Sequence, residues 1–176
     1  MVFAHDTTAA LQAAVALVNS AEPPDTMTTP DELDEFFAAH DYTGSRTHDA
    51  AELAAVRALR APLRRLLTSD RDEAVRIVNE ILAERHAVPA LVRHDGWDYH
   101  LHATDPSAPL ADRIAVETAM AMVDLVRGDE LSRLAVCADE TCDGLVLDLS
   151  RNRSRRYCSA ACGNRIAVAA YRARKG

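Results

Sequence analysis

The apolar positions of residues 1–127 follow a mainly helical pattern. Apolar side chains recur every three or four residues, which places them on one face of an α-helix. The pattern predicts five helices, at residues 6–19, from residue 30 through Phe37, and at residues 49–67, 70–82 and 109–127. Residues 91–102 instead form two alternating runs joined by Asp95-Gly96, which predict a β-hairpin. We therefore expect an N-terminal domain that is mainly α.

Residues that start or stop helices support these limits. Thr29 and Pro30 supply a capping side chain and a first-turn proline for the second helix. Pro62 lies inside the third helix and is expected to kink it, because proline lacks a backbone donor and clashes with the preceding turn. Gly128 is expected to end the fifth helix, and the chain then runs directly to Cys137.

The four cysteines of the chain stand as two close pairs, Cys137-x4-Cys142 and, fifteen residues later, Cys158-x3-Cys162. Each pair can supply two thiolates to one tetrahedral zinc ion. Two disulfides are the alternative. Residues 1–6 show no basic and then apolar stretch of the kind a secretory signal has, so we expect a reducing compartment, which favours the metal. Four thiolates leave no position for water, so the zinc ion is expected to be structural.

The residues around the cysteines predict the shape of this module. Residues 144–150 alternate apolar and polar side chains, and residues 151–157 follow a polar turn, so we expect a hairpin between the cysteine pairs. Ser159 can cap a helix that contains Cys162, which places the second pair at a helix N-terminus. The order of knuckle, hairpin and helix predicts an α+β protein that ends in a treble-clef-like finger.

Composition and charge divide the chain into two parts, which we place at residues 1–130 and 131–176. Apolar residues make up 48% of the chain, and no run is long enough to span a membrane. Residues 1–150 hold all 27 acids and 12 arginines, whereas residues 151–176 hold eight basic residues and no acid, so these segments carry −15 and +8. Such a basic segment favours phosphate binding, with a solvated tail as the alternative. Its members are Arg151, Arg153, Arg155, Arg156, Arg165, Arg172, Arg174 and Lys175.

The tetrapeptide Cys-Gly-Asn-Arg at residues 162–165 resembles the signature of the CGNR zinc finger. Flanking segments between residues 147 and 174 continue the resemblance, which covers about 45 residues. Tyr157 stands where tryptophan is more usual, and Val146 where phenylalanine is. These exchanges are expected to change packing more than metal binding.

The upstream part resembles the ABATE domain, which precedes this finger in bacterial proteins. The resemblance rests on Leu17-Val18-Asn19-Ser20, with serine in place of the usual threonine, and on residues 56–60 and 79–82. It implies a DNA-binding transcription regulator of the stress response in the bacterial cytoplasm, associated with the nucleoid. It also implies that the N-terminal domain senses a small molecule or a protein.

The arginines suit this implied function, because guanidinium groups neutralise phosphates and reach guanine edges. Within the tetrapeptide, we expect Asn164 to hold the zinc knuckle, whereas Arg165 can do the same or face nucleic acid. RNA binding is one alternative function. Docking of the basic finger on an acidic protein surface is another, and if that surface belongs to a second copy of the chain the result is a homo-oligomer.

Other polar residues of the chain are candidate sites. His94, His100 and His102 gather on the predicted hairpin, but no cysteine or carboxylate is placed to complete a metal site with them. The chain also lacks the phosphate loop, nucleophile elbow and His-Glu-x-x-His motifs, so we expect no enzyme. A cavity between the helices and the hairpin is a candidate ligand site. Its candidate polar groups, which capping or buried hydrogen bonds would equally explain, are Asn19, Arg60 and Asn79.

Overall fold

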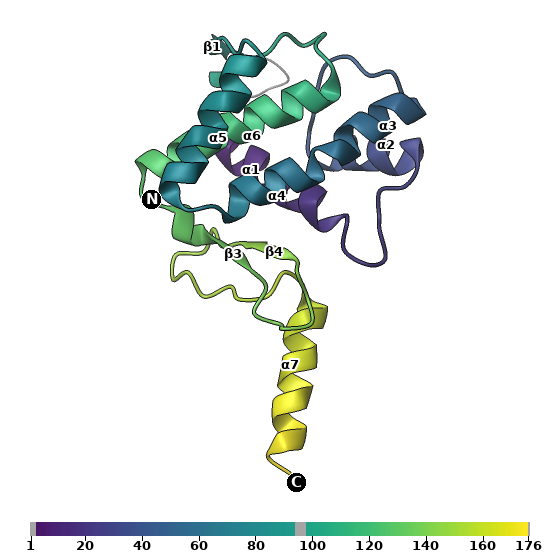
Figure 1. The fold of residues 1–176 in the computed structure, drawn as a ribbon, viewed down its shortest axis with the longest axis vertical. Coiled ribbons are helices and arrows are strands. Elements are labelled where there is room, and N and C mark those ends of the chain that lie inside the picture. The colour runs from purple at the N-terminus through teal and green to yellow at the C-terminus, as the bar shows by residue number, and fades with distance from the viewer. Residues whose placement is uncertain (1–2, 94–97, 176) are drawn as a thin grey trace.

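The computed structural model describes residues 3–93 and 98–175, which form a helical bundle joined to a small C-terminal module (Figure 1). The bundle contains α1 (His5–Asn19), α2 (Pro30–Ala39), α3 (Ala50–Ala58), α4 (Arg60–Thr68), α5 (Arg71–Glu84) and α6 (Leu110–Arg127). Strands β1 (Ala90–Val92) and β2 (His100–His102) form one antiparallel pair, and β3 (Leu134–Val136) and β4 (Leu145–Leu147) form another. The 3-10 helix η1 (Leu131–Arg133) precedes β3, and α7 (Ala160–Ala173) follows the second pair. The predicted mainly helical fold is confirmed.

Helix α6 lies at the centre of the bundle and packs against both α1 and α5. Ile114 and Met122 of α6 have no exposed surface, and Leu11 and Leu17 of α1 are equally buried. Each such side chain contributes about 1.5–3 kcal/mol by leaving water. The apolar periodicity of the sequence therefore identified the residues that hold the bundle together.

Thr29 caps α2 as predicted. Its Oγ1 accepts a hydrogen bond from the backbone N–H of Glu32 at 3.2 Å, and Glu32 Oε2 accepts one from the N–H of Thr29 at 3.0 Å. This capping box satisfies two donors that the helix itself cannot pair. Asp49 and Asp70 cap α3 and α5, each by accepting from the N–H three residues later.

The predicted kink at Pro62 is confirmed, as a break between α3 and α4. Pro62 has no N–H to give to the carbonyl of Ala58, and α3 ends at that residue. The N–H of Leu59 instead donates to the carbonyl of Val56 at 3.1 Å, a tighter 3-10 bond, and α4 begins one residue later. The segment therefore forms two short helices that follow the curvature of the core.

Strands β1 and β2 confirm the hairpin predicted for residues 91–102. Leu91 lies opposite Leu101 in antiparallel register. Both side chains are exposed, at 68% and 43%. The predicted turn at Asp95-Gly96 lies outside the described residues.

The prediction of a hairpin between residues 144–150 and 151–157 is wrong. Strand β4 pairs instead with β3, a short apolar run that comes directly before Cys137. The N–H of Cys137 donates to the carbonyl of Gly144 at 2.8 Å and continues the ladder into the turn. The hairpin therefore carries the first cysteine pair at its tip and does not lie between the two pairs.

Two local features keep residues 151–157 out of a strand ladder. Arg153 has a φ of 48°, in the left-handed region, which interrupts an extended strand. Asp148 Oδ2 accepts the backbone N–H of Arg155 at 2.6 Å, so a side chain takes a donor that a strand would offer to its neighbour. The segment is an exposed loop, and we call residues 151–156 the arginine loop.

The β3–β4 hairpin docks on the bundle against α1 and α4. Leu145 and Leu147 are 2% and 6% exposed and belong to the same apolar core as the bundle. Helix α7 points away from the bundle (Figure 1). Within the described part of the chain, every helix is too short or too polar to cross a membrane.

Candidate metal centre and nucleic-acid interface

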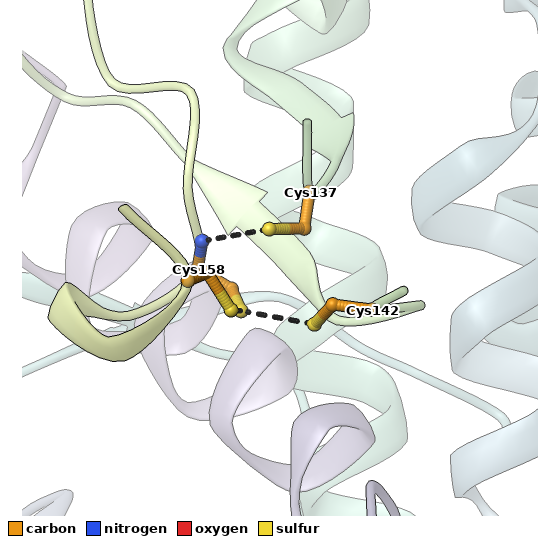
Figure 2. A group of neighbouring side chains, drawn as sticks. Cys137, Cys142 and Cys158 are labelled. Atoms are coloured by element: carbon orange, nitrogen blue, oxygen red, sulfur yellow. Dashed lines mark hydrogen bonds between the residues drawn. The ribbon is translucent and has the colours of Figure 1, made fainter. Parts of the chain in front are cut away.

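The four cysteines meet between the tip of the β3–β4 hairpin and the start of α7. Figure 2 labels three of them, Cys137, Cys142 and Cys158. Their sulfur atoms all lie within 4.8 Å of one another. Cys158 Sγ lies 3.5 Å from Cys142 Sγ and 3.6 Å from Cys162 Sγ. The sulfurs of a disulfide lie only about 2.05 Å apart. The four residues are therefore free thiols, and the two-disulfide alternative does not describe this structure.

The donor set fits a single zinc ion. Sulfurs bound at about 2.3 Å in a tetrahedron lie about 3.8 Å apart, close to the observed spacings. Burial, together with the neighbouring thiols, raises the pKa of Cys158, so a dication is needed to offset four thiolates at this distance. The hydroxyl of Ser159 donates to Cys162 Sγ at 3.3 Å, and this bond, together with the neighbouring cysteines, lowers the pKa of that thiol to about 7. The cluster is a closed site for one structural Zn2+.

Backbone groups also point at the sulfurs. The N–H of Cys158 donates to Cys137 Sγ at 3.4 Å (Figure 2), and the N–H of Gly144 donates to Cys142 Sγ at 3.4 Å. Gly144 has no room for a side chain, because a Cβ there would lie 2.9 Å from Cys158 Sγ. The turn after the first cysteine pair is therefore shaped around the metal site.

Arg165 is part of the metal site. Its Nη2 donates to Cys162 Sγ at 3.0 Å and lies 2.7 Å from Asp139 Oδ2. The other oxygen of Asp139 accepts from the hydroxyl and the N–H of Thr141, at 2.8 and 3.1 Å. One guanidinium group thus ties the hairpin tip to α7. Sequence reasoning missed Asp139, although Asp-x-Thr is a common signal for such a turn.

The structural contacts expected of Asn164 belong to Arg165 instead. Asn164 is exposed, and within residues 3–93 and 98–175 its side chain makes no hydrogen bond. It stands two positions after Cys162, about 200° around the helix, whereas Arg165 stands three positions after it and shares its face. Their spacing from Cys162 along the helix therefore indicates which of the two residues supports the metal site.

A buried ion pair between Glu130 and Arg133 anchors the arginine loop. Arg133 Nε donates to Glu130 Oε2 at 2.8 Å, and its Nη1 donates to the carbonyls of Asp148 and Ser150 at 3.0 and 3.2 Å. Arg153 Nη2 donates to the same Glu130 oxygen at 2.5 Å. Sequence reasoning missed the pair of Glu130 and Arg133, although their spacing of three is typical of helical ion pairs.

The structure places the eight predicted nucleic-acid residues in three groups. Arg153 and Arg165 hold the module together, as described above. Arg155 donates to the carbonyls of Tyr157 and Cys158 at 3.4 and 3.3 Å, and its side chain lies on the surface. The others are exposed and form no ion pair in the described part of the chain: Arg151, Arg156, Arg172, Arg174 and Lys175.

The bundle contains a cavity between α1, β2 and α6, and the three residues expected to line a ligand pocket do not line it. Asn19 bonds to the backbone of Leu145. Arg60 forms an ion pair with Asp25 at 2.9 Å and donates to the carbonyl of Met27. Asn79 is exposed on α5. The polar side chains of Asn19 and Arg60 thus form hydrogen bonds inside the protein, which was the alternative explanation for them.

The histidines of the hairpin form no complete metal site among the described residues, where the four cysteines are the one close group of three or more metal-ligating side chains. His100 Nε2 lies 3.0 Å from His102 Nε2. His94 lies outside the described residues.

A helical domain followed by a closed four-thiolate finger defines a zinc-finger protein. Residues 133–175 match the model of the CGNR zinc finger. Residues 11–129 match the ABATE model, described as "Putative stress-induced transcription regulator". A comparison with curated proteins finds no match. The chain belongs to the ABATE family and carries a CGNR zinc finger, as the resemblance of its sequence predicted.

Proposed function

We propose that this protein is a bacterial transcription regulator that binds duplex DNA through its zinc finger, in the cytoplasm and at the nucleoid. In this proposal the zinc ion holds the arginine loop beside the first turn of α7. The helical domain is the effector domain, and no step of the function is an enzymatic reaction. We therefore divide the chain at about residue 130 into an effector domain and a DNA-binding finger.

The exposure of α7 carries the proposal. Cys162 is the one buried residue of this 14-residue helix, which points away from the bundle (Figure 1). A helix of that length spans about 21 Å, and the major groove, about 12 Å wide, admits a helix. Arg172 is exposed in its last turn, and Arg174 follows it.

The charge of the finger supports the same conclusion. Of the eight basic residues, Arg153 and Arg165 are the two that form ion pairs within the described residues. Six cations are therefore left to face phosphates. They come from the arginine loop and from the end of α7: Arg151, Arg155, Arg156, Arg172, Arg174 and Lys175.

Docking on another macromolecule is the second candidate function. Val168 and Tyr171 of α7 are 48% and 51% exposed, which suits a protein partner as well as a groove. An exposed tyrosine beside arginines also suits stacking on an unpaired RNA base. These alternatives predict a different dependence on salt and on the form of the nucleic acid.

Fluorescence anisotropy of the zinc-loaded full chain tests the proposal. Random duplex DNA, single-stranded DNA and single-stranded RNA are titrated at several salt concentrations. Duplex binding should weaken linearly on a log–log plot, with a slope of about −0.9 for each phosphate contacted. Absence of duplex binding at low salt, or clear preference for either single strand, would overturn it.

Substitutions of single arginines locate the surface that contacts DNA. Arg172→Ala should reduce the magnitude of the salt slope by about one, because it removes one cation from the interface. Arg93→Ala is the matched control, since Arg93 is an exposed arginine just after β1. Chelation of zinc should abolish binding, because a structural zinc ion contributes directly to folding of its module.

A further inference from the structure

The bundle contains a cavity of about 480 Å3 between α1, the loop after α2, β2 and α6. This volume lies within the usual range of small-molecule sites. Much of the wall is apolar and comes from small side chains, among them Ala10, Ala13 and Ala121. The cavity lies along the first half of α1, whereas Asn19 at the other end of that helix contacts the finger.

Tyr42 lines this cavity, and its unpaired hydroxyl group is enclosed by protein atoms beside it. The residue lines the cavity and is 9% exposed, and its hydroxyl has no hydrogen-bond partner in the structure described. The centroid of its ring lies 6.0 Å from the ring centroid of Phe36 and 6.1 Å from that of Phe37. A buried polar group without a partner costs about 1–3 kcal/mol. A bound molecule that draws the hydroxyl toward the cavity and pairs with it would remove this cost.

Glu117 is a second polar group without a partner in the same wall. Its carboxyl group makes no hydrogen bond or ion pair within the described residues. Arg113, one turn earlier on α6, lowers the pKa of Glu117 through its charge but forms no ion pair with it, and its guanidinium donates instead to the carbonyls of Thr43, Ser45 and Ala108. Burial raises the pKa of Glu117 to about 7, because the wall around it solvates its charge poorly.

The charges of the wall favour a cation as the missing partner. Among the described residues, Arg127 is the one arginine that lines the cavity, and no lysine does. Burial lowers the pKa of His40, another lining residue, so this imidazole is neutral near pH 7. Beside His100 and His102, four carboxyl groups of described residues line the same space, and they disfavour an anionic ligand: Asp6, Asp41, Glu117 and Asp124.

We propose that this cavity binds a small organic cation, an amine or amidine with an apolar body. Its charged group pairs with the carboxylate of Glu117 and donates a hydrogen bond to the hydroxyl oxygen of Tyr42. Its apolar body lies against the alanines of α1 and α6. Binding itself is independent of DNA, and only its regulatory consequence rests on the function proposed above.

Isothermal titration calorimetry of the zinc-loaded full chain tests the ligand class with three phenyl-bearing probes of similar size. Benzylamine is cationic, benzyl alcohol is neutral and benzoate is anionic. Benzylamine should bind with a stoichiometry of one and at least about tenfold more tightly than the other two, a difference of about 1.4 kcal/mol. Equal or tighter binding of the alcohol or of benzoate would overturn the proposal. So would the absence of benzylamine binding at millimolar concentration.

Variants test the site. Glu117→Gln keeps the size of the side chain and should weaken benzylamine binding at least about tenfold, whereas Tyr42→Phe should weaken it several-fold. Glu80→Gln is the matched control, because Glu80 is exposed on α5 and pairs with Arg76 outside the cavity. Circular dichroism and thermal unfolding establish that each variant is folded. Unchanged affinity of the folded Glu117→Gln chain would overturn the assignment.

The DNA assay separates this proposal from the previous one. A chain that binds duplex DNA but no benzylamine overturns the cavity proposal alone. A chain that binds benzylamine, with loss of affinity in Glu117→Gln, but no DNA supports the cavity and overturns the DNA-binding proposal. A change in DNA affinity on adding benzylamine, absent in Glu117→Gln, would show that the two sites are coupled.

Discussion

Asn19 and Leu145 exchange two hydrogen bonds between the helical bundle and the zinc finger. The side-chain amide of Asn19 donates to the carbonyl of Leu145 at 2.9 Å, and its Oδ1 accepts the N–H of Leu145 at 2.6 Å. The last residue of α1 therefore pairs with the free edge of β4 as a neighbouring strand would. The finger is anchored to the bundle by a polar contact as well as by its apolar core.

Asn19→Ala should destabilise the protein by about 1–3 kcal/mol, because it leaves both backbone groups of a buried strand residue without partners. Urea unfolding followed by circular dichroism measures the change. Asn79→Ala is the control, since that asparagine is exposed on α5, and it should change the free energy of unfolding by less than about 0.5 kcal/mol. Similar effects of the two substitutions would contradict the role of Asn19.

Gly144→Ala should weaken zinc binding by about tenfold or more, because the added Cβ would lie 2.9 Å from Cys158 Sγ. Competition with a chromogenic chelator measures the affinity. Gly163→Ala is the matched control, since a Cβ there meets the ring of Tyr157 at an ordinary 3.4 Å. Alanine also favours the helix by about 0.5–1 kcal/mol, so this variant should keep its metal. Loss of zinc from both variants alike would refute the steric explanation.

Arg165→Lys should lower zinc affinity, since a lysine cannot reproduce the planar group that donates to Cys162 Sγ and pairs with Asp139. Loss of such a supporting contact typically costs about 10–100-fold in metal affinity. Arg172→Lys, two turns further along α7, should leave zinc affinity unchanged, because Arg172 is exposed and away from the metal. Chelator competition on both variants provides the comparison, and equal zinc affinities would show that Arg165 is dispensable for the site.

Glu117→Gln should stabilise the unliganded protein at alkaline pH. The pKa of Glu117 is raised from its usual 4.5 to about 7 in the folded protein, so ionisation favours the unfolded chain. The cost is absent below about pH 4.5, grows up to about pH 7 and is constant above it. Relative to the parent, Glu117→Gln should therefore gain about 1–3 kcal/mol on going from pH 4.5 to pH 8.

Thermal or urea unfolding of both chains across this pH range measures the difference, in which contributions from other titrating groups largely cancel. A stability difference that does not change with pH would show that the carboxyl group is well solvated. Such a result would also remove one of the physical reasons for a ligand in the cavity.

Local signals predicted the helices and the metal ligands well. Thr29 with Glu32, and Pro62, act on the backbone within one turn, and the cysteine spacing alone identified four ligands. Strand β3 was missed because three apolar residues carry too short a pattern, and β4 was assigned to the wrong neighbour. Pairing of strands depends on which segment the core brings alongside, and here the bundle holds β4 through Leu145 and Leu147.

The sequence by itself determined the helical periodicity, the four thiolates, the basic C-terminal segment and the family to which the chain belongs. Each depends on residues that are neighbours along the chain. Only the tertiary structure decided that Asn19 reaches Leu145, that Arg165 and not Asn164 supports the zinc site, and that Tyr42 and Glu117 line one cavity. Such contacts join segments far apart in sequence, and their selection depends on how the whole core packs and which polar groups it leaves unpaired.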